Sequence, residues 1–149
     1  MRRVTLRETV FADIPVFFEQ QTDPIARELA AYPLKEWERF ESGWRRSIEE
    51  EVHILRTIDV EGVVAGHLVA WQENGDAFFG YWLDRALWGQ RIMTAAIAEF
   101  LPLIPSRPLF ATVAVHNDAS AALLIRAGFI EGERRIADDG VLEILFRLD

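Results

Sequence analysis

The chain has 149 residues, half of them hydrophobic, and it contains no cysteine. A chain of this length fits one domain, which buries roughly 70% of its unfolded surface, so we expect a single domain over residues 1–149. The composition excludes a disordered protein. Without cysteine there is no disulfide framework, thiolate nucleophile or zinc–thiolate site. The three histidines form no cluster with metal-ligand spacing, so we expect no metal.

The net charge of −8 argues against a nucleic acid partner, because phosphate backbones bind basic surfaces. The same charge favours a cationic substrate through electrostatic steering. Lys35 is the only lysine, and the arginines can still bind phosphates locally. No apolar run approaches the ~20 residues of a membrane span, and residues 1–6 lack the apolar segment of a signal peptide. We therefore expect no membrane contact and a cytoplasmic location.

The first third of the chain alternates between strand and helix signals. Residues 4–8 read as a short strand, and Asp13 is placed to cap a helix with a proline in its first turn. Breaks at 23–24 and 32–33 interrupt a loosely helical region. A helix over 35–48 is predicted because its large apolar residues share one stripe between charged neighbours. That stripe consists of Trp37, Phe40, Trp44 and Ile48.

Residue patterns typical of β-strands dominate the middle of the chain. Alternating or β-rich runs predict strands over 52–58, 63–71 and 77–83. The Asn74-Gly75 pair is a strong hairpin signal between the last two. These three strands are expected to form an antiparallel meander.

Helix and strand alternate again in the last third. A helical stripe begins at Ile92 and ends before Pro102. Residues 109–115 form an apolar, β-branched run that is typical of a buried central strand.

Asn117 or Asp118 caps a further helix that runs through Ala127, and a glycine closes it. The ranges 129–136 and 141–148 read as two last strands. Taken together, the elements predict an α+β fold whose sheet has a mixed centre.

The stretch 80–94 runs from a strand end through a glycine-containing loop into a helix. Backbone N–H groups at a helix start, together with the helix dipole, form an anion site. Arg85 and Arg91 flank this one. An ordinary strand-to-helix connection has the same pattern, so phosphate binding is one of two readings.

Four motifs follow one another in the chain: Gly80-Tyr81-Trp82-Leu83, Trp88-Gly89-Gln90-Arg91-Ile92-Met93-Thr94, Asn117-Asp118-Ala119-Ser120 and Gly128-Phe129. In order and spacing they resemble the GCN5-related N-acetyltransferase (GNAT) family. The similarity is to its ribosomal-protein-alanine N-acetyltransferase (RimJ/RimL-like) branch in particular, and it covers essentially the whole chain. The resemblance implies a mixed, mostly antiparallel sheet that is splayed in the middle and flanked by about four helices.

The resemblance also implies acetyl-CoA as co-substrate. In the family, pantetheine pairs with the exposed backbone of the strand that matches 77–83, and the pyrophosphate binds the loop that follows. The cofactor-binding residues implied here are Trp82, Leu83, Trp88, Gly89, Gln90, Arg91, Ile92, Met93, Thr94, Asn117 and Arg126, the last near the 3′-phosphate.

Ser120 would lie near the thiol sulfur, where its hydroxyl helps to protonate the leaving thiolate, and Asn117 would hold the pantetheine or the acyl region. Ser120 also has an alternative role as a local cap in the first turn of its helix. An acceptor for the amine proton is also required. The side-chain candidates are His67, His116 and Glu73, and we take a water molecule or His67 first. Each has an alternative role, respectively as a half-buried strand residue, a strand-end surface residue and a solvated turn charge.

Three positions depart from the family pattern. Arg91 replaces a loop glycine and fits if its backbone is already helical, with the side chain directed outward. Met93 replaces a small residue, and Phe78 stands where an acidic residue is common. These departures motivate an alternative, a catalytically degenerate module that binds CoA or another ligand as a sensor.

The acceptor pocket implied by the resemblance is lined by aromatic residues from several segments, namely Tyr32, Trp37, Trp71 and Tyr81. Trp37 also reads as a core residue because of its helical spacing. The function expected is acetyl transfer from acetyl-CoA to a primary amine by direct attack. The amine belongs to a protein N-terminus or a small molecule, and the chain is compatible with a homodimer.

Overall fold

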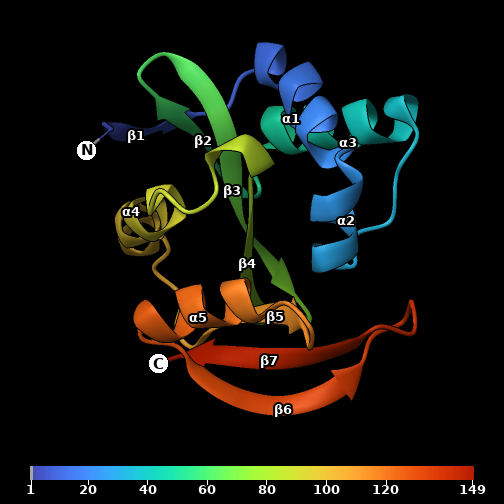
Figure 1. The fold of residues 1–149 in the computed structure, drawn as a ribbon, viewed down its shortest axis with the longest axis vertical. Helices are drawn as coiled ribbons and strands as arrows, with labels where there is room; N and C mark the ends of the chain where they lie inside the picture. Colours follow the sequence, from blue (N-terminus) through green and yellow to red (C-terminus); the bar gives the residue numbers. More distant parts are fainter. Residues whose placement is uncertain (1) are drawn as a thin grey trace.

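One seven-stranded sheet runs through the protein in the order β1-β2-β3-β4-β5-β7-β6 (Figure 1). The structure is a computed structural model that describes residues 2–149. The strands are β1 (Val4–Glu8), β2 (Ile54–Val60), β3 (Val63–Glu73), β4 (Asp76–Leu83), β5 (Leu109–Ala114), β6 (Ile130–Ile136) and β7 (Leu142–Leu148). All neighbouring strands are antiparallel except β4 and β5, which are parallel. The predicted mixed, mostly antiparallel α+β architecture is confirmed.

Within the described residues 2–149, five α-helices accompany the sheet, one more than the sequence predicted. They are α1 (Ile14–Gln21), α2 (Pro24–Ala30), α3 (Trp37–Glu50), α4 (Ile92–Phe100) and α5 (Asp118–Arg126), with short 3-10 turns at Phe11–Asp13, Arg85–Leu87 and Leu101–Leu103. The additional helix is α2. It begins after Asp23, whose carboxylate accepts a hydrogen bond from the Ala26 N–H at 2.9 Å. Among residues 2–149, no helix has the length and apolarity needed to cross a membrane.

The helices bury two apolar clusters. The larger one joins α4 and α5 to the sheet and includes Ile97, Phe100 and Leu124. The smaller one lies between α1 and α3, which run beside each other in Figure 1, and is centred on Phe17 and Phe40. Because side chains alternate along a strand, β3 contributes to both. The smaller cluster therefore anchors α1 and α3 beside the face of β3 that carries His67.

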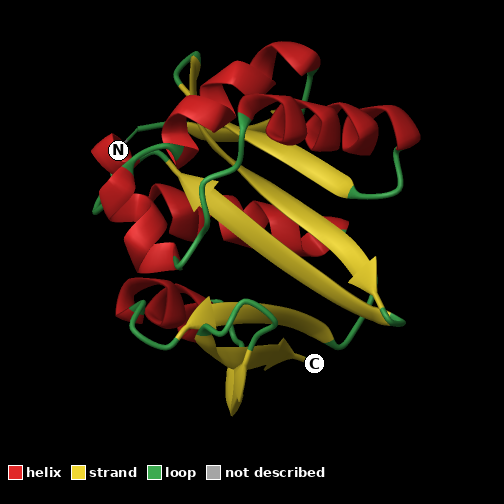
Figure 2. Cartoon of the chain, turned by 90° about the vertical axis from the view of Figure 1, so that its right-hand side faces the viewer, coloured by secondary structure: helices red, strands yellow, loops and turns green. Residues whose placement is uncertain are grey.

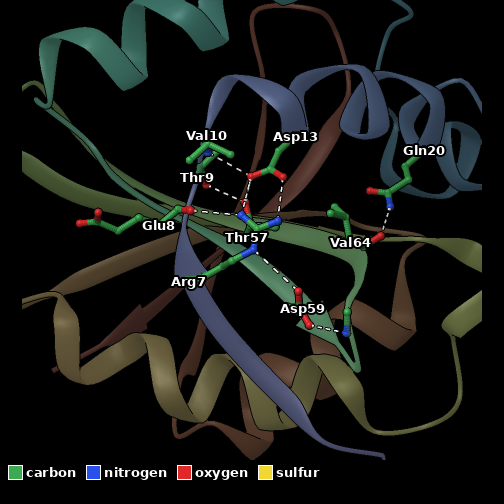
Figure 3. A network of polar contacts seen from close by, with 10 residues as sticks. Arg7, Glu8, Thr9, Val10, Asp13, Gln20, Thr57, Asp59 and Val64 are labelled. Carbon is green, nitrogen blue, oxygen red and sulfur yellow. Dashed lines mark hydrogen bonds and ion pairs between the residues drawn. The ribbon is translucent and has the colours of Figure 1, made fainter.

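Asp13 does not cap α1 as the sequence predicted. It occupies the N-cap position, but its carboxylate makes no capping bond. Figure 3 shows what it does instead: it accepts hydrogen bonds from the Arg7 guanidinium at 2.8 and 2.9 Å, from Thr57 Oγ1 at 2.8 Å and from the Val10 N–H at 3.0 Å. Burial by itself raises the pKa of Asp13, but these bonds together hold the pKa below its ordinary value. The network ties β1 and β2 to the start of α1.

The sheet is splayed between β4 and β5. Only two residue pairs join these strands, Ala77 with Leu109 and Phe78 with Phe110. Beyond them β4 continues to Leu83 and β5 continues to Ala114, but the two strands no longer pair with each other. Figure 2 shows the two halves of the sheet diverging. The N–H and C=O groups on these facing edges are therefore free to bind a ligand.

Candidate active site

A cleft of about 880 Å³ opens where β4 and β5 diverge, and we call it the main cleft. Its walls come from the facing strand edges, the start of α4, α5, α2 and β3. The predicted site residues that line it are Tyr32, His67, Trp71, Tyr81, Trp82, Leu83, Trp88, Gly89, Arg91, Ile92, Met93, Thr94, Asn117, Ser120 and Arg126. The fold thus brings together in one cavity residues from both halves of the chain.

Two predicted site residues, Gln90 and Trp37, are not among the described residues that line the main cleft. Gln90 is exposed, and its Oε1 accepts a hydrogen bond from Arg2 Nη1 at 3.3 Å. Trp37 packs edge-on against Phe18, with ring centroids 5.2 Å apart, in the smaller apolar cluster. Trp37 therefore packs as a core residue, which is the alternative that its helical spacing indicated.

Two of the three candidate bases, His116 and Glu73, also lie outside the lining formed by residues 2–149. The His116 ring Nε2 is 2.9 Å from the carbonyl oxygen of Glu28 and joins the loop before α5 to α2. Glu73 is exposed at the β3–β4 hairpin. Of the three candidates, His67 alone borders the main cleft.

The start of α4 offers free hydrogen-bond donors to the main cleft. The first N–H groups of a helix have no partner within it. Those of Ile92, Met93 and Thr94 find no acceptor elsewhere in residues 2–149. With the helix dipole, they provide the anion site suggested by the sequence.

From the sequence, Arg91 fits in place of a loop glycine on the condition that its backbone is helical. The backbone of Arg91 is not helical. Arg91 precedes α4 with φ 61° and ψ 19°, in the left-handed region that favours glycine. Its exposed side chain still borders the cleft. Met93 is only 4% exposed and packs in the larger core, as expected for a side chain folded into the helix–sheet packing.

Three buried polar atoms in the main cleft have no hydrogen-bond partner among residues 2–149. They are Gln21 Oε1, His67 Nδ1 and Trp82 Nε1. An unsatisfied buried donor or acceptor costs about 1–3 kcal/mol, and these three atoms are buried from solvent within the wall of the cleft.

Tyr81 and Ser120 share a hydrogen bond across the main cleft. Their hydroxyl oxygens are 2.5 Å apart, although the residues are 39 positions apart in the chain. Burial raises the pKa of Tyr81 to about 12, and the bond to Ser120 offsets part of this rise. The phenol is therefore neutral and able to donate. The sequence placed Tyr81 among the pocket residues, but no local pattern indicated its bond to Ser120.

Asn117 occupies the N-cap of α5. Its side-chain oxygen accepts a hydrogen bond from the Ser120 N–H at 3.3 Å. Of the two caps predicted, Asn117 is the one observed. This bond fixes the first turn of α5 and with it the backbone that carries the Ser120 hydroxyl.

His67 lies on β3 between the rings of Phe17 and Trp44, with centroid distances of 4.6 and 4.8 Å. Burial lowers its pKa to about 3. The imidazole is therefore neutral near pH 7 and holds an added proton only weakly.

A second cavity of about 290 Å³, which we call the side cavity, adjoins the main cleft. Five residues line both spaces: Tyr32, Lys35, Trp44, Val69 and Trp71. The side cavity also carries Arg39 and His53, which the sequence did not single out. The available signal was the four-residue spacing of Arg39, Gly43 and Ser47, which places them along one line of α3, whereas Lys35 precedes the helix.

The whole-chain architecture and the cleft at the splayed strands define an acyltransferase-like α+β fold. The sequence matches the family model described as an acetyltransferase (GNAT) domain over residues 3–130. The chain therefore belongs to the GNAT acetyltransferase family. A search of curated proteins gave no match.

Several solved structures share this fold. A ribosomal-protein-alanine N-acetyltransferase from Brucella melitensis is 22% identical, with a TM-score of 0.79 over 96% of this chain and 97% of that one. Mycobacterium smegmatis RimJ in complex with CoA-disulfide is 21% identical, with a TM-score of 0.76 over 97% and 81%. A spermidine N-acetyltransferase chimera that includes the Vibrio cholerae protein is 14% identical, with a TM-score of 0.77 over 97% and 95%.

Proposed function

We propose that the protein transfers an acetyl group from acetyl-CoA to a primary amine. One observation carries the proposal: β4 and β5 pair at only two positions, and the strand edge left open leads to free N–H groups at α4. Family membership and the CoA complex of a protein with the same fold support it.

The residues present fit CoA. The N–H groups at the start of α4 and the Arg91 guanidinium would bind the pyrophosphate, and Arg126 would bind the 3′-phosphate. The open edge of β4 at Leu83 would pair with pantetheine amides. The Trp82 carbonyl faces Gly66 of β3, so Trp82 would contact pantetheine through its side chain. The Leu83 carbonyl already accepts a hydrogen bond from Trp88 Nε1 at 3.1 Å, which positions the Trp88 ring beside the loop. The complete proposed set is Trp82, Leu83, Trp88, Gly89, Gln90, Arg91, Ile92, Met93, Thr94, Asn117 and Arg126.

Acetyl-CoA supplies an activated thioester. The amine nitrogen forms a bond to the thioester carbon, the carbon–sulfur bond breaks, and the thiolate leaves. Free N–H groups on the open edge of β4 would stabilise the charge that develops on the thioester oxygen. Ser120 would donate a proton to the thiolate and regain one from Tyr81 through their shared hydrogen bond. Once the amine nitrogen is bonded to the acyl carbon it would release a proton to water, and water would return one to Tyr81, so the products are the amide and the free thiol.

The amine must reach the thioester without its extra proton. With a pKa of about 3, His67 is too weak a base to retain that proton at pH 7. We assign the proton to water, with His67 as a neutral hydrogen-bonding group on the wall of the cleft.

Calorimetry with CoA tests the binding step, and release of free CoA thiol in the presence of an amine panel tests the chemistry. We expect a Kd near 1 μM, about −8 kcal/mol, and weaker binding of dephospho-CoA if Arg126 holds the 3′-phosphate. Absence of binding at millimolar CoA would overturn the proposal. Binding without thiol release for any amine would favour the non-catalytic sensor module instead.

A further inference from the structure

The side cavity continues the main cleft away from the splayed strands. Its five shared lining residues make the two spaces contiguous. Its volume of about 290 Å³ is at the lower end of the range for small-molecule sites. Aromatic rings form much of its wall, including Phe40, Trp44 and Trp71.

Among the described residues that line the side cavity, the charged ones are both cations, Lys35 and Arg39. Neither forms an ion pair with a carboxylate within residues 2–149. Lys35 Nζ lies 5.8 Å from the centre of the Tyr32 ring, and His53 Nδ1 is buried there without a hydrogen-bond partner. In a chain of net charge −8, these two cations without a carboxylate partner are a local reversal of charge.

The orientation of α3 produces this reversal. Arg39, Gly43 and Ser47 follow one another at four-residue spacing and line the side cavity. Glu41 lies on another face, where it pairs with Arg45 at 3.6 Å. A Cβ added at Gly43 would meet nothing within 4 Å, so the helix leaves space at the middle of this line.

We propose that the acceptor is a primary amine that also carries a carboxylate, and that Lys35 and Arg39 bind this carboxylate in the side cavity. The inference rests on the proposed acetyl transfer. Arginine and lysine both donate charge-assisted hydrogen bonds to carboxylates. The aromatic wall would contact the apolar part of the acceptor, and the amine would then point toward the main cleft. A polycation such as spermidine would meet like charges here.

Acceptors that differ only in the carboxylate provide the test. L-Phenylalanine, phenylalanine amide and phenethylamine share an amine and a ring, and spermidine serves as the polycation. We expect kcat/KM for L-phenylalanine to exceed that of either uncharged analogue at least ~10-fold. A second pair, the C-terminally amidated dipeptides Phe-Glu and Phe-Gln, shows whether the carboxylate comes from a free amino acid or from an acidic peptide.

Matched variants localise the effect. Lys35→Gln and Arg39→Gln should each lower kcat/KM for the preferred carboxylate acceptor ~10-fold and leave phenethylamine turnover and CoA affinity unchanged. Arg46→Gln, on the same helix but outside the described lining of the side cavity, is the control with the same charge change. Equal use of spermidine and the carboxylate amines, or equal losses for charged and uncharged acceptors, would overturn the inference.

The inference can be separated from the proposed function. If CoA neither binds nor reacts, the acetyltransferase proposal fails. Calorimetry of L-phenylalanine, phenethylamine and the two amidated dipeptides with the wild type and the variants then decides the inference. A carboxylate-dependent affinity that Lys35→Gln and Arg39→Gln reduce supports it, and its absence with both carboxylate probes refutes it.

Discussion

The main cleft and the side cavity offer different chemical groups to a ligand. In the main cleft, the free strand edge of β4 and the N–H groups of Ile92, Met93 and Thr94 are backbone groups, assisted by a few side chains. In the side cavity, Lys35, Arg39 and the aromatic wall are side chains from separate elements.

This difference determines how each region responds to substitution. A backbone donor survives most changes of side chain, which is consistent with Arg91 before α4 and Met93 in its first turn at positions where the resembled family has small residues. A side-chain site changes its ligand when one residue changes. We therefore expect the main cleft to be sensitive to backbone geometry and the side cavity to be sensitive to residue identity.

The largest effect is expected from Gly66→Ala, which perturbs the backbone behind the main cleft. A Cβ at Gly66 would lie 2.0 Å from the Trp82 carbonyl oxygen, so β3 and β4 would have to separate. We expect a loss of about 3 kcal/mol or more in the free energy of unfolding, measured by urea denaturation, and weaker CoA binding in the folded fraction.

Gly43→Ala is the matched control in the wall of the side cavity. It makes the same chemical change in a helix with open space at that position. The free energy of unfolding should rise by about 0.5–1 kcal/mol, with CoA affinity unchanged. Similar losses at both glycines would contradict the contrast between the two regions.

The second prediction concerns Ser120, to which we assign the role of proton donor in the main cleft. Ser120→Ala should lower kcat about 100-fold while changing CoA affinity little, because the thiolate loses its proton donor. Tyr81→Phe should lower kcat less, since Ser120 keeps its own proton. Melting temperatures measured on the same samples check that folding is intact. Unchanged kcat per folded molecule in Ser120→Ala would assign Ser120 a purely structural role in the first turn of α5.

The third prediction uses the pH dependence of stability. The folded-state pKa of His67 is about 3, below its unfolded value near 6.5, so the unfolded state takes up a proton first as the pH falls. The stabilising contribution is complete above pH ~6.5 and should fall by about 2 kcal/mol between pH 7 and 5.

Denaturation of the wild type and His67→Gln at each pH isolates this contribution. The difference between the two unfolding free energies should change with pH in the stated direction. A difference that stays constant between pH 7 and 5 would show that His67 titrates normally. It would then qualify again as the catalytic base.

The smallest effect is expected from Arg91→Gly. Removal of the left-handed strain should stabilise the fold by about 1 kcal/mol, whereas loss of one charge-assisted contact should weaken CoA binding by about 1–2 kcal/mol. Thermal denaturation and CoA titration of the same variant measure the two effects. Tighter CoA binding by Arg91→Gly would mean that Arg91 obstructs the main cleft, and the sensor module would then be the better assignment.

Much of the fold could be predicted because the signals are local. Alternating strands, the Asn74-Gly75 hairpin and the apolar stripe of α3 each arise from residues that are neighbours in the chain. The role of Asp13 could not be predicted, because its partner Thr57 is 44 positions away. The same reason applies to the bond between Tyr81 and Ser120.

The sequence by itself determined the order of the strands and of every α-helix except α2, the family, and the loop that offers backbone N–H groups, since these depend on local propensity and motif spacing. Only the tertiary structure decided the left-handed backbone of Arg91, the desolvation of His67 and the cationic wall made by Lys35 and Arg39. Overall charge had favoured a cationic substrate. Binding, however, depends on the charges that line a cavity, and packing selects those from segments far apart in the chain.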